Sequence, residues 1–235
     1  MNWNWQAIFE YFPALLQASW TTIELVAVSC VLGLVFGTVL GVMRAAKNPV
    51  VRFLPFLYIF FFRGTPLLVQ IFLIYYGLGQ FDWVKQSFLW KPVLSQPYWC
   101  AIIAFMLNTT AYIAEIVRGA IQSIPKGELE AADVLGMTKL QKLRRITLPR
   151  AFGIMLPAYS NEVIFMIKGS ALASTIAIMD LTNQARELIA QTYLTLEMYF
   201  AAGVIYLVIS WGAMLLFRLL EHFVNRHKST VMDAV

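Results

Sequence analysis

Long apolar runs alternate with shorter polar connections along the whole chain. Five of these runs are long enough, at 1.5 Å per residue, to cross a hydrocarbon core about 30 Å thick. The pattern therefore predicts five transmembrane helices, at residues 22–43, 54–78, 99–117, 156–178 and 199–220. The first 20 residues carry Trp3, Trp5 and Trp20 but neither a basic start nor a small-residue cleavage site, so we expect an interfacial segment rather than a signal peptide.

Composition limits the class of protein. Of 235 residues, 60% are hydrophobic and 13% charged, and the mean hydropathy is +0.68. A typical soluble domain has about 45–50% apolar and about 25% charged residues. A soluble sphere could not bury so much apolar surface, which excludes a soluble enzyme, a nucleic-acid-binding module and a disordered chain. We predict an all-α integral membrane protein with a single transmembrane domain over residues 1–235, with buried thiols at Cys30 and Cys100 rather than a disulfide.

The net charge is +5, and the positions of the Lys and Arg residues predict the orientation in the membrane. Of the 18 Lys and Arg residues, 13 fall between the first two predicted spans, in the loop after the third, or in the tail with Arg218, Arg226 and Lys228. Only 3 fall on the opposite side, and Arg63 and Lys168 lie within spans. Because cytoplasmic loops are enriched in Lys and Arg, we predict that the N-terminus lies outside and the C-terminus in the cytoplasm.

The longest soluble connection, residues 119–150, is predicted to fold into short helices. After a proline, Glu128 and Glu130 fall in the first turn of a helical stretch, where carboxylates suit the positive end of the helix dipole. Gly136 should end that helix as a left-handed cap, and a basic stretch then leads to Pro149, which can only start or break a helix. Taken alone, this punctuation is equally typical of an ordinary solvated loop.

The spacing within this loop resembles a known motif. Seven residues stand at the spacing of that motif: Glu130, Ala131, Ala132, Gly136, Ile146, Leu148 and Pro149. They resemble the EAA loop of the membrane subunits of binding-protein-dependent ATP-binding-cassette importers. Residues 62–66 (FRGTP), 111–115 (AYIAE) and 156–164 (LPAYSNEVI) are similar to the polar amino acid permease branch of that family. The last segment is most similar to permeases for histidine, lysine, arginine, ornithine and opines, and the resemblance covers nearly the whole chain.

The resemblance implies a division of labour among several proteins. In that family the loop supplies a coupling helix that contacts a cytoplasmic ATPase. The resemblance implies that the coupling residues here are Glu128, Glu130, Ala131, Ala132 and Gly136. The chain has no G-x-x-x-x-G-K-[ST] phosphate loop, so we expect it to bind no cofactor itself and ATP to be used by two partner ATPase subunits. The other expected partners are a second permease subunit, identical or different, an extracytoplasmic solute-binding protein, a small amino acid and the bilayer of a bacterial inner membrane, but no nucleic acid.

Polar residues inside the spans are the candidate substrate ligands, because charges near the bilayer midplane are costly and usually functional. In the second span, Arg63 offers a fork suited to a carboxylate, and Gly64 and Pro66 predict a broken helix. We expect Arg63, Gly64, Thr65 and Gln70 to meet the α-carboxylate of an amino acid. An ion pair between Arg63 and a neighbouring helix would account for this arginine equally well.

The fourth and third spans carry further polar residues. Asn161 and Glu162 are expected near the inner third of the fourth span, where Glu162 could pair with the cationic side chain or the α-amino group of a substrate. The third span has a polar stripe at helical spacing, which favours packing against protein and consists of Asn108, Tyr112 and Glu115. Glu115 falls three residues before Arg118, so a local ion pair is expected there.

Together these expectations predict the permease subunit of an ATP-driven importer that translocates polar, and in particular basic, amino acids. A proton-coupled secondary transporter with Glu162 or Glu115 as its relay is the alternative. A membrane enzyme is disfavoured and no catalytic residue is expected, because no nucleophile and base occur together within a span. No metal site is expected either, because His222 and His227 stand without cysteines or clustered carboxylates at ligand spacing.

Overall fold

The computed structural model describes residues 3–232, and the side chains up to Val224. The side chains of Arg226, His227 and Lys228, which entered the charge and metal arguments, lie outside this described part. Residues 3–232 contain no strand. The α-helices are α1 (Trp5–Ala45), α2 (Pro49–Gly64), α3 (Leu67–Phe72), α4 (Asp82–Lys85), α5 (Pro97–Gln122), α6 (Lys126–Val134), α7 (Lys139–Lys142), α8 (Leu148–Gly169), α9 (Leu181–Thr192) and α10 (Thr195–Met232). Short π-helical turns are η1 (Leu73–Gly77), η3 (Trp90–Leu94) and η4 (Leu143–Thr147), and 3-10 turns are η2 (Leu78–Gln80) and η5 (Ser170–Ile176).

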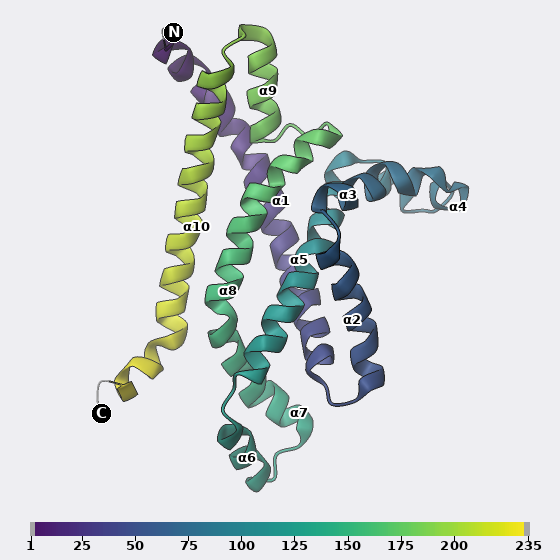
Figure 1. The fold of residues 1–235 in the computed structure, drawn as a ribbon, viewed down its shortest axis with the longest axis vertical. Helices are drawn as coiled ribbons and strands as arrows, with labels where there is room; N and C mark the ends of the chain where they lie inside the picture. The colour runs from purple at the N-terminus through teal and green to yellow at the C-terminus, as the bar shows by residue number, and fades with distance from the viewer. Residues whose placement is uncertain (1–2, 233–235) are drawn as a thin grey trace.

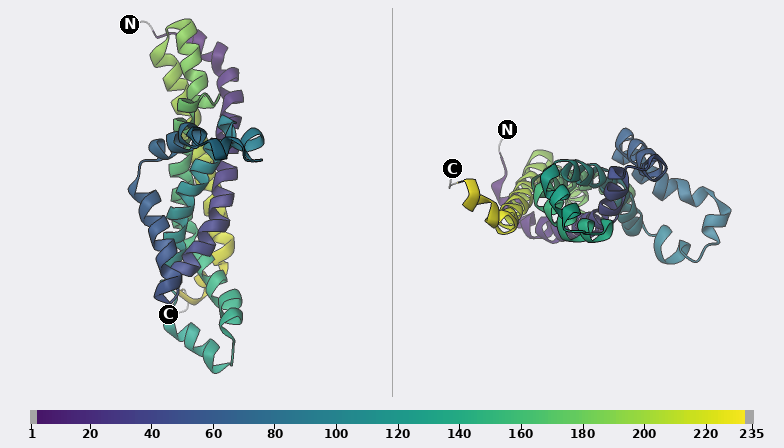
Figure 2. Two further views of the ribbon diagram at one scale, coloured as in Figure 1. Left: turned by 90° about the vertical axis from the view of Figure 1, so that its right-hand side faces the viewer. Right: turned by 90° about the horizontal axis from the view of Figure 1, so that it is seen from below.

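Four long helices, α1, α5, α8 and α10, form an elongated bundle, and α2 packs against α1 and α5 (Figure 1). At one end of the bundle, α9 packs against α1 and α10, and at the other end α6 and α7 extend beyond it. The segment around α3 and α4 projects sideways from the bundle (Figure 2). The described chain therefore begins and ends toward opposite ends of the long axis, while its sidedness in the membrane stays a prediction.

Three helices, α1, α5 and α10, are long and apolar enough to cross a membrane, and up to five spans result if each of two bent helix pairs counts as one. The first pair joins Pro49–Gly64 to Leu67–Gln80 with a bend of 105°, and the second joins Lys139–Ile176 to Leu181–Thr192 with a bend of 52°. An all-helical fold with long apolar helices is confirmed. The count of five is compatible with these helices and stays a prediction.

The N-terminal segment differs from the expectation of a separate interfacial stretch. Helix α1 is 41 residues long and runs without interruption from Trp5, through Pro13, into the first predicted span. Its first half has protein partners, because the fully buried Leu15 packs in one cluster with Leu181 of α9 and Met198 of α10. Burial against two other helices stabilises a helix that the aromatic composition alone did not predict.

Glycines let α1 and α5 approach closely. Three of them, Gly33, Gly37 and Gly41, recur every fourth residue on α1 and are all buried against α5. A Cβ atom added at Gly33 would lie 2.2 Å from Cγ2 of Thr109, and one at Gly41 would lie 2.7 Å from the carbonyl oxygen of Ala114. Small residues at such spacing permit close helix contact in membrane proteins. The pairing fixes α5, which carries much of the site described below.

Candidate functional site

The helical segment predicted as the second span is broken where the sequence predicted a break. Helix α2 ends at Gly64 and α3 begins at Leu67. Pro66 lies between them and has no backbone N–H with which to continue the helix. The side chain of Gln70, only 2% exposed, closes the gap, because its Nε2 donates to the carbonyl oxygen of Phe62 (2.8 Å) and to the carbonyl and hydroxyl oxygens of Thr65 (3.0 and 2.8 Å). Two carbonyl oxygens at the break, those of Phe62 and Thr65, are thus satisfied within the protein, as a membrane interior favours.

Helix α5 supports this arrangement from the side. The side-chain amide of Asn108 donates to Oε1 of Gln70 at 2.9 Å. Both polar side chains are buried, so the contact joins α5 to the break through a hydrogen bond that is costly to leave unmade. Gln70 and Thr65 were predicted substrate ligands, and the structure commits their polar atoms to the break itself.

Arg63 stands at the last turn of α2 with its side chain exposed. Its guanidinium carbon lies 5.0 Å from the centroid of the Tyr112 ring on α5, within the range of a cation–π contact. Within residues 3–224, no carboxylate lies at ion-pairing distance from Arg63. Gly64 beside it leaves open space, since a Cβ built there would meet no atom within 4 Å.

Glu162 on α8 is buried, with 7% of its surface exposed, and accepts a hydrogen bond of 3.0 Å from the hydroxyl of Thr109 on α5. It lines a first cavity of about 320 Å³ between α3, α5 and α8. The other lining residues are Leu67, Asn108, Tyr112, Phe165 and Met166. Asn161, predicted beside Glu162, is exposed on α8 and does not line this cavity.

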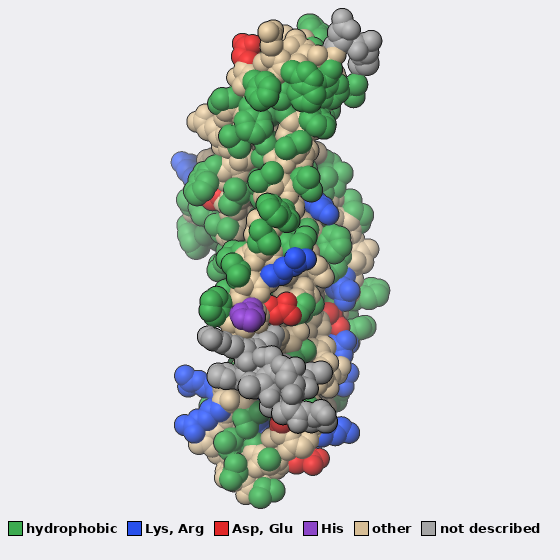
Figure 3. Space-filling model, turned by 90° about the vertical axis from the view of Figure 1, so that its left-hand side faces the viewer, with side chains coloured by type: hydrophobic (Ala, Val, Ile, Leu, Met, Phe, Trp, Pro, Cys, Tyr) green, Lys and Arg blue, Asp and Glu red, His purple; other side chains and the backbone are tan. Residues whose placement is uncertain are grey.

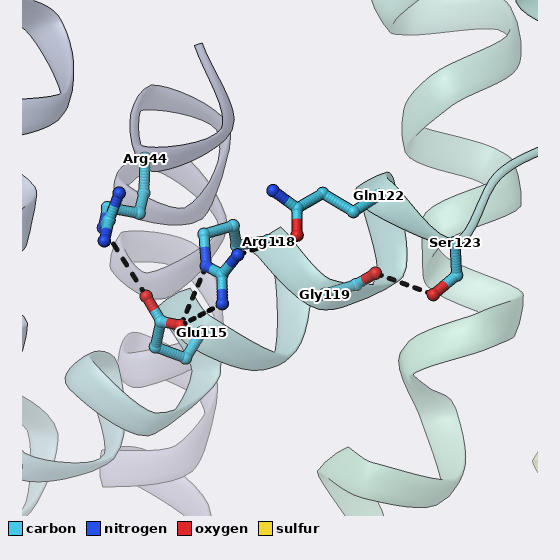
Figure 4. A network of polar contacts seen from close by, with 6 residues as sticks. All are labelled: Arg44, Glu115, Arg118, Gly119, Gln122 and Ser123. Carbon is cyan, nitrogen blue, oxygen red and sulfur yellow. Dashed lines mark hydrogen bonds and ion pairs between the residues drawn. The ribbon is translucent and has the colours of Figure 1, made fainter. Parts of the chain in front are cut away.

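A second cavity of about 460 Å³ lies between α1, α2 and α5, and Tyr112 lines both. Its charged lining residues are Arg44, Arg63 and Glu115. Figure 4 shows Glu115 between two arginines: Nε of Arg44 lies 3.7 Å from one carboxylate oxygen, and Arg118 donates to the other at 2.7 and 2.8 Å. The predicted pair of Glu115 with Arg118 is confirmed.

The polar stripe of α5 faces cavities, which its sequence pattern did not predict. Asn108 and Tyr112 line the first cavity, and Tyr112 and Glu115 line the second, although all three were assigned to packing. Arg44 was counted only as a loop charge. A polar stripe beside a predicted helix break was the available signal, because a broken helix leaves space next to its neighbour.

The loop between α5 and α8 is a compact helical unit. Helix α6 begins at Lys126, so Glu128 falls in its first turn, whereas Glu130 is its fifth residue and lies beyond that turn, which corrects the prediction. Gly136 has φ +71°, the left-handed conformation predicted for it. Of the two alanines in the motif, Ala131 is exposed while Ala132 is buried within this chain.

Ion pairs brace this loop on both sides. Glu128 pairs with Arg150 of α8, so the start of α6 is tied to the bundle. Asp133 pairs with Lys142 of α7 at 2.5 Å. Apolar side chains are nevertheless exposed at the tip of the loop, in particular Val134 (88%) and Leu135 (75%). Exposed apolar side chains clustered at a tip indicate a surface that contacts another protein.

Charges and apolar side chains are separated along the molecule. On the face shown in Figure 3, most Lys and Arg side chains lie in the lower half, toward the loop, while apolar side chains dominate the upper half. The groups of His, Cys, Asp and Glu in the described residues include none that could hold a metal ion.

A helical bundle with a broken span, polar cavities facing the break and a braced loop at one end defines a polytopic membrane transport subunit. The chain belongs to the family of binding-protein-dependent transport system inner membrane components, whose family model matches residues 33–226. It is a permease subunit, and not itself an enzyme.

Individual relatives share most of its length. The octopine transport system permease protein OccM of Rhizobium radiobacter is 47% identical over 214 residues, which cover 91% of this chain and 87% of the relative. The arginine ABC transporter permease protein ArtM of Haemophilus influenzae is 42% identical over 212 residues, covering 90% and 92%. Among solved structures, an amino acid ABC transporter with histidines superposes with a TM-score of 0.82 at 33% identity, covering 94% of this chain and 99% of that one.

Proposed function

We propose that this chain is the membrane-spanning subunit of an ATP-driven importer for basic amino acids or related opines in a bacterial inner membrane. The similarity to permeases named for octopine and arginine supports this substrate class. In this proposal the chain crosses the membrane five times, with its N-terminus outside and its C-terminus in the cytoplasm. The excess of Lys and Arg near the α6–α7 end supports that orientation.

The single observation that carries the substrate proposal is the placement of opposite charges on either side of Tyr112. Arg63 has no carboxylate partner within residues 3–224, and Glu162 has no cationic partner at ion-pairing distance there. A basic amino acid carries both complementary charges. Arg63 would bind its α-carboxylate through a bidentate, charge-assisted contact, and Glu162 would bind its α-amino group or cationic side chain.

The neighbouring polar residues take supporting parts in this proposal. Gly64 leaves room for the substrate beside Arg63, and Thr65 and Gln70 hold the break that presents the arginine. Asn161 offers an exposed amide next to Glu162, at a surface that a second permease subunit would cover. A binding site that is complete only between two subunits follows from this arrangement.

The energy for transport comes from other proteins in this proposal. Two ATPase subunits would bind the loop through the exposed residues of α6 and its cap, in particular Glu130, Ala131 and Gly136, while Glu128 and Ala132 hold the loop to its own chain. An extracytoplasmic binding protein would deliver the solute. ATP-driven closure of the ATPases would then rock two permease subunits, identical or different, between inward-facing and outward-facing states.

The test is uptake of labelled arginine, histidine, glutamine and octopine by proteoliposomes that contain the complete complex, with and without ATP. ATP-dependent accumulation of the basic amino acids or the opine is the expected result. Accumulation by this chain alone, driven by a proton gradient, would instead establish the proton-coupled alternative. Accumulation restricted to glutamine would remove the proposed substrate class while leaving the transport class intact.

A further inference from the structure

The polar stripe of α5 connects the two cavities. Asn108 lines only the first cavity, Glu115 lines only the second, and Tyr112 between them lines both. At spacings of four and three residues, these side chains follow one face of the helix toward its Gln122 end. A solute that leaves the first cavity along this face therefore meets the Tyr112 ring and then the second cavity.

The two cavities differ in charge. Among the side chains that the structure describes, Glu162 is the only charged one lining the first cavity, whereas two arginines and one glutamate line the second and leave it an excess of one positive charge. The glutamate is already shared between Arg44 and Arg118. Nε of Arg44 is buried without a hydrogen-bond acceptor among the described residues, so its guanidinium is not fully satisfied by the chain. The excess positive charge among the lining residues favours an anionic group in the second cavity.

The Tyr112 ring is held in place between the cavities. The Arg63 guanidinium lies over it at 5.0 Å, and a second arginine, Arg44, lies 5.3 Å from the centroid of Phe56 on the opposite wall. Both arginines thus rest on aromatic faces and present charge toward the same space. The volume of about 460 Å³ falls within the range of about 300–1,000 Å³ that is typical of small-molecule sites.

We infer that the second cavity is an inner vestibule that receives the transported amino acid after it leaves the Glu162 cavity, with Tyr112 as the partition between them. This inference rests on the proposed function. The carboxylate of the substrate would enter first, because Arg63 already faces the partition and Arg44 lies beyond it, while its cationic group leaves Glu162 last. The Tyr112 ring would limit return of the solute from the vestibule.

Substrate protection of single cysteines tests this inference in the complete complex. Phe165→Cys reports on the first cavity and Phe60→Cys on the second, and both positions are well exposed (68% and 71%). The native Cys30 and Cys100 are buried, so their background reaction with a water-soluble methanethiosulfonate reagent is low. Leu140→Cys, which lies on α7, is 67% exposed and lines neither cavity, is the matched control.

Saturating arginine should slow modification of both cavity cysteines, by about twofold each if one molecule divides its time equally between the two sites, and should leave Leu140→Cys unchanged. Protection at Phe165→Cys without protection at Phe60→Cys would overturn the vestibule together with the Arg63 contact to the carboxylate, while ATP-dependent uptake of the basic amino acids would still support the proposed import. Absence of protection at both positions would overturn the vestibule and the Glu162 contact as well, and absence of ATP-dependent uptake would overturn the proposed function itself. Modification of Phe60→Cys that is blocked without substrate and restored by delipidation would assign the second cavity to a phospholipid headgroup and overturn the vestibule.

The partition is tested separately by the retention of solute. Tyr112→Ala removes the ring between the cavities, so it should raise the ATP consumed per solute and lower the steady-state accumulation ratio about tenfold, a change equivalent to about 1.4 kcal/mol. Tyr112→Phe keeps the ring and should restore the ratio. Unchanged accumulation by Tyr112→Ala, with unchanged ATP consumed per solute, would refute the partition.

Discussion

The close packing of α1 on α5 makes one substitution unusually informative. A Cβ atom at Gly41 would lie 2.7 Å from the carbonyl oxygen of Ala114 and 2.7 Å from Cβ of Val117, where ordinary contacts are 3.4–4 Å. The backbone oxygen cannot move aside as a flexible side chain can, so Gly41→Ala must separate the two helices. Overpacking of this kind costs about 1–3 kcal/mol, which is about 5- to 150-fold in the folding equilibrium.

Separating α1 from α5 would also affect the contact between Arg44 and Glu115. Arg44 is three residues beyond Gly41, and its Nε already lies 3.7 Å from Glu115, near the limit of an ion pair. We therefore expect Gly41→Ala to weaken this contact as well as the packing. Both effects lower the stability of the bundle at the end that carries the loop.

Thermal unfolding of the purified complex measures the effect. For a chain of this size, a loss of 1–3 kcal/mol should lower Tm by about 2–12 °C. Gly212→Ala on α10 is the matched control, because a Cβ built there meets no atom within 4 Å. Equal Tm values for the two variants would refute the claim that glycine is required for this helix contact.

Three further substitutions test the proposed roles. Arg63→Ala should reduce uptake at least about 30-fold, corresponding to about 2 kcal/mol for a lost charged contact, with assembly by size-exclusion chromatography unchanged; normal uptake kinetics would disprove the carboxylate role. Glu162→Gln should weaken arginine uptake about tenfold more than glutamine uptake in competition assays, and equal losses would remove its role in charge selection. Gly136→Val should strain the φ of +71° by about 1–2 kcal/mol and reduce the ATPase that co-purifies with the complex, whereas unchanged co-purification together with normal uptake would contradict the docking role.

Features that depend on local chemistry were predictable from the sequence. The apolar runs marked the long helices, since a helix can satisfy its own backbone in lipid. Pro66 after Gly64 predicted the break in the second span, and Gly136 predicted the left-handed end of α6. Each of these depends on the residue itself and on its immediate neighbours, so distant contacts were not needed to foresee it.

Features that depend on which helix faces pack against one another in the fold were not predicted. The polar stripe on α5 was visible, but only the position of α2, α3 and α8 shows that Tyr112 lines two cavities. The early start of α1 follows from contacts with α9 and α10, nearly 200 residues away in sequence at Met198. Gly33, Gly37 and Gly41 were an available signal for close packing, because glycine at every fourth position is typical of tight membrane helix pairs.

The amide of Gln70 has a consequence for how such a molecule can move. From α3 it bonds Phe62 and Thr65 on the α2 side of the break and is itself held by Asn108 of α5, so hydrogen bonds join α2, α3 and α5 despite a bend of 105°. Because these hydrogen bonds would have to break before the corner between α2 and α3 could bend, we expect the corner to move as a unit rather than as a hinge. Rotation during the transport cycle must then be taken up outside this three-helix body, and any solute held by Arg63 travels with it.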